Sequence, residues 1–529
     1  MITRRTLLGS AAALPMLAMP SVLRAQGASG GTLRYVPSSN LTILDPVFTP
    51  AAVSITHGYC VFDTLYGVDS DLKPQPQMAA GHTVSDDGLT WEITLRDGLT
   101  FHDGEPVRAQ DCAASLDRWS QRDAFGQALR AATEAFEAKD DKTVRIRLTR
   151  PFGPLLEAIG KPHSSPAMIM PERLASQPIA EQVTEMVGSG PFRFLADEYV
   201  SGDRVVYEKF QDYVPRSGPA SWTSGGKVVH FDRLIWQIIP DEATKVAAIQ
   251  AGEVDWISTV LPDLVPIIAA APGVELFQTD PFGLMTVMRF NHLQPPFNNP
   301  EIRRAVMMAV NQLPYLQSIT ASDDERQECR AMFPCGMPGV EELGSDMMSP
   351  PHTLDEARKM LADAGYDGER VVILNPTDIA SIHPHGLVTA DLLTQLGMNV
   401  DLQDTDWGTV VQRRVSKEPV ENGGWSIAHT NWPAISIANP ATNATTRGIG
   451  QGGWWGWFED AETERLVEAW LSATDPAEQQ RLFNEAHQRA LEMVPVVPLG
   501  QVFRTGAIRS DLQGALHGSV DMFWNVHRT

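Results

Sequence analysis

Six residues in the second half of the chain carry side chains suited to holding an organic molecule. They are Asp378, His383, Trp407, Asn431, Trp432 and Trp454. Tryptophan offers a large, rigid apolar surface with one hydrogen-bond donor, which suits a cleft that closes on a solute. Trp432 stands in a polar loop between Asn431 and Pro433, so it is the strongest candidate, followed by Trp407.

Each of these residues also fits an ordinary structural role. A chain of this length buries several tryptophans in its core, and Trp425, inside an expected strand, fits the core better than a binding site. Asp378 and His383 stand in the loop of residues 375–385, where such side chains are commonly solvated. The candidates form a binding site only if the fold brings them together.

Motifs for catalysis, nucleotides and metals are weak. Residues 448–453 satisfy G-x-G-x-x-G, but no strand precedes them and tryptophans follow where a helix should begin. Residues 188–192, GSGPF, lack the G-x-S-x-G nucleophile elbow. His383 and His385 stand without H-E-x-x-H or a cysteine partner. We therefore predict that the protein is not an enzyme and holds no cofactor or resident metal.

Charge and length exclude several classes of partner and fold. The 529 residues carry a formal net charge of −23, which repels phosphate backbones and anionic membrane surfaces. We expect no nucleic-acid partner. The length exceeds what one core supports, so two or three subdomains are expected. After the N-terminal segment, no stretch reaches the roughly 20 apolar residues of a membrane span.

Residues 1–27 predict a signal peptide. Arg4 and Arg5 precede an apolar run that is too short to span a bilayer. The paired arginines are typical of a twin-arginine signal, although a Sec signal remains an alternative. Cleavage is expected near Ala25, with residues 27 and 28 as other possible ends. Loss of three arginines and no acid then takes the net charge from −23 to −26, and the mature protein is expected in the periplasm.

The chain has four cysteines, too few for disulfides to be the framework of an exported protein of this size. Cys329 and Cys335 lie close together in a loop rich in proline and glycine, and an oxidising compartment favours a small disulfide loop there over a metal pair. Cys60 and Cys112 are expected to be buried apolar residues.

Residues 85–119 give the clearest local structure in the first half. Three apolar residues from Trp91 to Leu95 alternate with polar ones, which predicts a strand buried on one face. Asp97 and Gly98 supply a turn. Apolar residues at 112, 116 and 119 then share one helical face, so a helix is expected to pack back on the strands.

Two later stretches combine a strand, a helix and a second strand. In the first, residues 231–239 predict a strand, and the helix after it ends at Gly252. In the second, Thr353 and Glu356 form a capping box for a helix, and strands follow at 371–374 and 399–405. This alternation predicts an α/β fold with parallel strands. Ligands gather beyond the carboxyl ends of such strands, which is where the loop of residues 375–385 begins.

Three segments carry a resemblance to a known family. Residues 95–111 (LRDGLTFHDGEPVRAQD), 238–255 (IIPDEATKVAAIQAGEVD) and 290–306 (FNHLQPPFNNPEIRRAV) occur in this order along the chain. They resemble the family 5 extracellular solute-binding proteins, the dipeptide, oligopeptide and nickel receptors of bacterial ABC importers. Three separate matches in the right order make coincidence an implausible account.

The resemblance implies a two-lobed periplasmic-binding-protein fold of type II, similar to cluster C. The first lobe is expected over residues 28–278 with a satellite subdomain at about 67–180, the second over 279–494, and residues 495–529 return to the first. Two crossings join the lobes, the first at Asp280-Pro281. Asp45 ends a loop that in the family returns toward the ligand cleft, so it is a further candidate.

The resemblance also implies partners. Such a receptor encloses a small-molecule solute between its lobes and delivers it to a membrane complex of ABC permease and ATPase. A monomer is expected. Two alternatives remain: a receptor for a metal chelate of the nickel type, and, from another class, a secreted hydrolase that uses acidic residues.

The sequence departs from the family pattern in two loops. Peptide receptors are expected to hold the ligand's amino group with an aspartate in the loop that corresponds to residues 430–440, which contains none. Dipeptide receptors take the carboxylate with an arginine in the loop that corresponds to residues 375–384, which also contains none. A desolvated charge without a partner costs several kcal/mol. We therefore predict that ordinary dipeptides are poor ligands.

Overall fold

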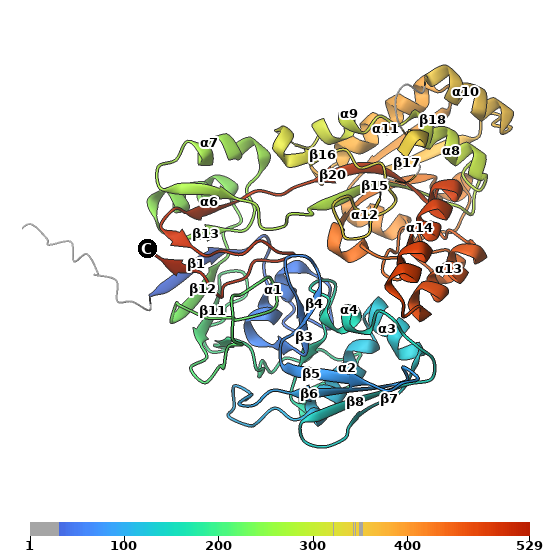
Figure 1. The fold of residues 1–529 in the computed structure, drawn as a ribbon. Helices are drawn as coiled ribbons and strands as arrows, with labels where there is room; N and C mark the ends of the chain where they lie inside the picture. Colours follow the sequence, from blue (N-terminus) through green and yellow to red (C-terminus); the bar gives the residue numbers. More distant parts are fainter. Residues whose placement is uncertain (1–30, 321, 342, 344, 349–352) are drawn as a thin grey trace, which may run out of the picture.

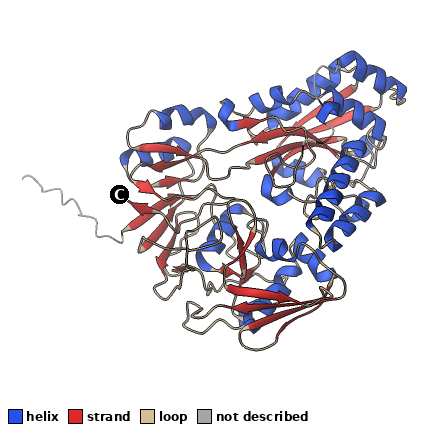
Figure 2. Cartoon of the chain, viewed as in Figure 1, coloured by secondary structure: helices blue, strands red, loops and turns tan. Residues whose placement is uncertain are grey.

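The computed structural model describes residues 31–320, 322–341, 343, 345–348 and 353–529, so the predicted signal peptide lies outside the described residues. Two lobes, each built on one large mixed sheet covered by helices, are joined by two connecting segments (Figure 1, Figure 2). This architecture confirms the predicted α/β, two-lobed fold.

A seven-stranded sheet forms the first lobe. Its middle strand, β1, pairs in parallel with β12 and β13, and α6 (Glu242–Ala251) connects these two strands along the chain. Asp241 caps α6 by accepting a hydrogen bond from the Thr244 amide, and Gly252 ends it with a φ of 73°. In order across the sheet, the strands are β10 (Phe192–Phe194), β11 (Arg204–Lys209), β12 (Arg233–Gln237), β1 (Thr32–Val36), β13 (Trp256–Ile257), β21 (Gly506–Arg509) and β14 (Val274–Phe277).

Aromatic side chains pack the C-terminal tail, residues 510–529, against the sheet of the first lobe. Tyr35 of β1 packs edge-on against Trp236 of β12 and against Phe523 of the tail, with ring centroids 5.4 Å and 4.8 Å apart. Trp256 of β13 also contacts Phe523, at 5.6 Å. All four rings are buried. This packing fixes the tail where Asp521, two residues earlier, reaches the space between the lobes.

A separate four-stranded antiparallel sheet lies within residues 67–180, the range for which a satellite subdomain is predicted. Its strands, in order, are β5 (Ala79–Val84), β6 (Thr90–Leu95), β8 (Thr143–Leu148) and β7 (Thr133–Ala138). Helix α2 (Ala109–Ser120) packs on this sheet, and Cys112, Leu116 and Trp119 are fully buried, as their spacing predicts. Smaller elements of the first lobe are α1 (Ala52–Val61), β2 (Asp63–Thr64), β3 (Tyr66–Val68), β4 (Pro74–Pro76), α3 (Ala124–Ala131), α4 (Leu155–Gly160), β9 (Met168–Ile169), α5 (Glu172–Ala175), α7 (Val265–Ala269), β22 (Leu512–Gln513) and β23 (His527–Arg528).

A six-stranded sheet forms the second lobe. β17 pairs in parallel with β18 and β19, and α11 (His383–Gln395) connects β17 to β18 along the chain. The capping box of Thr353 and Glu356 forms at the start of α10 (Leu354–Asp363). In order, the strands are β16 (Arg326–Gln327), β20 (Val496–Val502), β15 (Leu284–Phe290), β19 (Ile427–Pro433), β17 (Arg370–Pro376) and β18 (Asn399–Thr405). The other helices are α8 (Pro300–Ala309), α9 (Gln312–Gln317), α12 (Trp407–Arg413), α13 (Ala461–Ser472) and α14 (Pro476–Met493).

Two short segments cross between the lobes. The first, residues 278–283, joins β14 to β15 and includes Asp280-Pro281, where the sequence placed a crossing. The second, residues 503–505, joins β20 to β21. The return to the first lobe thus begins after Val502, later than the residue 495 expected. The physical reason is that the apolar strand β20 is buried throughout and pairs with β15 inside the second lobe.

A disulfide joins Cys329 and Cys335, whose Cα atoms are 5.7 Å apart. It closes the short loop that follows β16. Cys60 and Cys112 are free and buried, and burial raises the pKa of both thiols. Among the helices of the described ranges, none is long and apolar enough to cross a membrane.

Candidate ligand-binding site between the lobes

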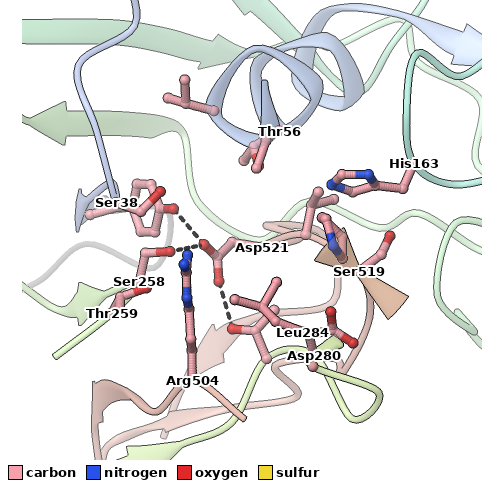
Figure 3. A pocket seen from close by; sticks show the side chains of 17 residues that line it. Ser38, Thr56, His163, Ser258, Thr259, Asp280, Leu284, Arg504, Ser519 and Asp521 are labelled. Carbon is pink, nitrogen blue, oxygen red and sulfur yellow. Dashed lines mark hydrogen bonds between the residues drawn. The ribbon is translucent and has the colours of Figure 1, made fainter. Parts of the chain in front are cut away.

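A cavity of about 130 Å³ lies where the two crossings meet the sheets (Figure 3). Its walls come from both lobes, because Tyr35 lies on β1 in the first lobe whereas Leu284 begins β15 and Pro433 ends β19 in the second. Hydroxyl groups are numerous in its lining. They belong to Ser38, Thr56, Ser258, Thr259, Thr279 and Ser519.

Asp521 organises one wall of this cavity. Its carboxylate accepts hydrogen bonds from the hydroxyls of Tyr35 (2.5 Å), Ser258 (2.6 Å) and Thr279 (2.7 Å), the three dashed contacts of Figure 3. These donors lie on β1, directly after β13 and on the first crossing. Burial raises the pKa of Asp521, an effect that the three hydroxyl donors oppose. One buried carboxylate thus links β1, the end of β13, the first crossing and the C-terminal tail by hydrogen bonds.

The two crossings each place a charged side chain in the cavity lining. Asp280 of the first accepts a hydrogen bond from the Phe282 amide at 2.9 Å, and burial raises the pKa of Asp280 to about 6. Arg504 of the second is solvent-accessible. Removal from bulk water lowers its pKa, which the Asp280 carboxylate opposes. Within the described residues, Arg504 has no hydrogen bond or ion pair.

A second cavity, of about 180 Å³, lies beside the first and shares His163 with it. The first lobe contributes Glu157 and Lys161, and the second contributes Ser436 and Asn439. Lys161 forms an ion pair with Asp123. Glu157 has no ion-pair partner among the residues that the structure describes, and burial raises its pKa. Each cavity alone is below the ~300 Å³ of small ligand sites, so the two together give the size a solute needs.

The lobes touch around these cavities. His163 forms a hydrogen bond with the Ser436 hydroxyl at 3.0 Å, and the Ser164 hydroxyl donates to the same oxygen at 2.7 Å. Burial lowers the pKa of His163 to about 4, so its ring is neutral at pH 7. Further along the interface, the Gly153 amide donates to the carbonyl of Leu471 in α13 at 2.8 Å. The structure is therefore a closed arrangement of the two lobes.

Asn431 and Trp432 lie on β19, the strand that ends at the cavity with Pro433. Trp432 packs edge-on against Trp454, with centroids 5.4 Å apart, and Arg289 lies over the Trp454 ring at 4.7 Å. The Asn431 amide donates to the Ser381 carbonyl at 3.2 Å. The Trp432 indole N–H is buried and has no hydrogen-bond partner in the described part of the chain. None of Asn431, Trp432 and Trp454 lines either cavity.

Asp378 and Trp407 meet at the carboxyl ends of β17 and β18, and His383 begins α11 beside Asn375. The Asp378 carboxylate accepts a hydrogen bond from the Trp407 amide at 2.8 Å, and Asn375 links His383 (2.9 Å) to Asp404 (2.7 Å). The predicted loops do converge, as parallel strands require. This cluster also lies outside the two cavities. No group of three metal-ligating side chains occurs in the described residues.

Asp45 is buried inside the first lobe. Its carboxylate pairs with Arg118 at 2.9 Å, and both side chains are almost fully buried. It also accepts hydrogen bonds from the amides of Val47 and Val183. Asp45 therefore lies outside both cavities and has little acceptor capacity left for a ligand.

Sequence reasoning missed the charged lining of the first cavity. Asp280 was noted as the crossing point, but Arg504 and Asp521 carried no motif and lie in the C-terminal segment. The two loops do lack the arginine and aspartate of a peptide clamp. The charged side chains of the cavity lie on the crossings and on the C-terminal tail, so the missing charges of the two loops do not by themselves exclude dipeptides from this site.

Comparison with known proteins assigns the chain to a family. Residues 73–454 match the model of the middle region of the bacterial extracellular solute-binding proteins, family 5. The chain belongs to that family. A probable peptide ABC transporter periplasmic-binding protein of Sinorhizobium fredii is 36% identical over 532 residues, covering 100% of this chain and 99% of the relative. The glutathione-binding protein of Salmonella typhi is 27% identical and covers 93% and 91%.

Solved structures share the fold of this family 5 protein. A periplasmic binding protein of Helicobacter pylori, in complex with the peptide STSA, superposes with a TM-score of 0.74 at 21% identity, covering 94% of this chain and 98% of that one. A Staphylococcus aureus protein in complex with Ni(L-His)₂ gives 0.72 at 14% identity, covering 94% and 100%. At such low sequence identities, these superpositions establish a common architecture only. The chain is thus a solute-binding receptor of an ABC importer.

Proposed function

We propose that this receptor encloses an organic solute in the two adjoining cavities and presents the closed form to a membrane permease. The observation that carries the proposal is the lining itself, which combines residues of both lobes and of both crossings. A solute that touches both lobes favours closure by its higher affinity for the closed state. His163, shared by the two cavities, is the central contact of this site.

Asn431, Trp432 and Trp454 extend the proposed site into the second lobe. Asn431 and Trp432 lie on β19, which ends at the first cavity with Pro433, and Trp454 packs against Trp432 behind that wall. Asp378, His383 and Trp407 form a second, more distant contact region at the ends of β17 and β18. Asp45 supports the first lobe from within.

The cellular setting follows from the same proposal. The protein is exported through the twin-arginine-like signal of residues 1–27, acts in the periplasm as a monomer, and delivers its solute to an ABC permease and ATPase without chemical change. The close relative described as a periplasmic peptide-binding protein supports this setting.

Thermal unfolding in the presence of a metabolite extract tests the proposal. A ligand that binds only the folded protein raises the unfolding temperature in a saturable way, by RT ln(1 + [L]/Kd) in free energy. We expect saturable stabilisation by the extract, and native mass spectrometry should then show a bound solute of unchanged mass. Absence of stabilisation by any fraction, or conversion of the solute to a product, would count against a receptor.

A further inference from the structure

Two opposite charges face the same cavity from the two crossings without pairing with each other. Asp280 lies on residues 278–283 and Arg504 on residues 503–505, and both line the first cavity. The described residues contain no ion pair or hydrogen bond between them. In Figure 3 the Arg504 side chain extends into the cavity rather than away from it.

Both groups are short of partners. The guanidinium carries up to five donors, and none of them is used within the described part of the chain. Asp280 accepts from a backbone amide, yet burial keeps its pKa raised in spite of Arg504, as expected of a carboxylate with no cation in contact. Arg504 is exposed and Asp280 is half-buried, so water solvates the guanidinium until a solute takes its place. A bound solute can supply both partners.

The crossings hold these two charges in fixed relation. β15 and β20 pair directly beside them, with Leu284 opposite Val502. The backbone of Gly283 lies so close to that of Val502 that a Cβ atom on residue 283 would be 2.3 Å from the Val502 carbonyl oxygen. The two crossings therefore run in backbone contact and cannot move independently at this point.

We propose that Arg504 and Asp280 form a charge clamp on the crossings, in which Arg504 binds a carboxylate of the solute and Asp280 binds an ammonium group. The inference rests on the function proposed above and names the residues that select the solute. The guanidinium fork matches a carboxylate in bidentate geometry. Since both residues lie on the connecting segments, the charge of the solute is recognised at the hinge rather than in the two loops of the second lobe.

Chemical blocking of the metabolite extract tests the clamp without knowing the solute. One portion of the extract is treated with methylamine and a carbodiimide to convert carboxylates to amides, and another with acetic anhydride to acetylate amines. We expect the untreated extract to stabilise the wild-type protein and both treated portions to lose most of this effect. Equal stabilisation by a treated portion would overturn the clamp and leave the receptor function intact.

Substitutions test the two residues directly. In Arg504→Gln and Asp280→Asn, the extract concentration that gives half-maximal stabilisation should rise at least about tenfold, the effect of losing a hydrogen bond to a charged group. Arg465→Gln and Asp355→Asn are matched controls, because both residues are exposed and form ion pairs only along their own helices. Wild-type response in Arg504→Gln refutes the clamp. Absence of stabilisation of the wild type by untreated extract refutes the receptor function, and the clamp with it.

Discussion

Replacing Gly153 by alanine is expected to weaken closure of the lobes. Gly153 lies between β8 and α4 of the first lobe, and its amide contacts α13 of the second. A Cβ atom at this position would lie 1.7 Å from the backbone oxygen of Ala473, which is far inside contact distance. The hydrogen bond from the Gly153 amide to the Leu471 carbonyl, now 2.8 Å, would also be lost or stretched.

The magnitude follows from these two contacts. Loss of the hydrogen bond costs about 1 kcal/mol, and overpacking against a backbone costs about 1–3 kcal/mol. Opening of the lobes relieves both, so the penalty falls on the closed state alone. Together these place ~2–4 kcal/mol against the closed state, which lowers the apparent solute affinity by about 30- to 700-fold.

The assay combines thermal unfolding with small-angle scattering. Without extract, Gly153→Ala should unfold close to the wild-type temperature but show a larger radius of gyration. With extract, its half-maximal stabilisation should require more extract than the wild type does. Gly81→Ala is the matched control in the same subdomain, because a Cβ there meets nothing within 4 Å. Wild-type affinity and dimensions in Gly153→Ala would refute the reasoning that this contact forms on closure.

Three further predictions follow from other contacts. Ser436→Ala removes the hydroxyl that forms hydrogen bonds with His163 and Ser164 across the lobes. Each bond contributes ~0.5–1.5 kcal/mol, so the solute affinity should fall by about tenfold in titration calorimetry. An unchanged affinity would show that these bonds do not stabilise the closed lobes. Burial raises the pKa of Asp280 to about 6, whereas the pKa of an aspartate in the unfolded chain is ~3.9. The folded state therefore binds this proton more tightly than the unfolded state does. As a result, the wild type loses stability as the pH rises from about 4 to 6. Asp280→Asn should therefore unfold at a higher temperature than the wild type at pH 7 but at the same temperature below pH 4. The other ionisable side chains of that cavity are Tyr35, His163, Arg504 and Asp521. A difference that stays constant across pH would contradict this prediction. Replacing both Cys329 and Cys335 by serine opens a short loop and should lower the free energy of unfolding by ~2 kcal/mol in urea titrations, whereas an unchanged midpoint would show that the bridge adds nothing.

The buried faces and the ends of several helices could be predicted from the sequence, because they depend on residues that are close together in the chain. The buried face of α2 followed from residues spaced three and four apart. The end of α6 at Gly252 was predicted from one residue, and the capping box of α10 from the pair Thr353 and Glu356. The first crossing at Asp280 was placed from a turn between two extended segments.

The candidate site was predicted only in part. The rule for parallel strands predicts that the loops after β17 and β18 lie close together, and the hydrogen bond from the Trp407 amide to Asp378 joins them. The cavities lie elsewhere. No local pattern indicated that Arg504 would lack a partner, because whether a charged side chain is paired depends on every residue around it.

The sequence by itself therefore determined the family, the two α/β lobes and the position of the first crossing, since these rest on local patterns and on motifs in order. The tertiary structure decided what surrounds the solute. Tyr35 and Asp521 are hydrogen-bonded although 486 positions separate them in the chain, and the tail reaches that place because aromatic packing against β1 and β13 holds it there. Contacts between distant segments are set by the packing of whole elements, which no local pattern encodes.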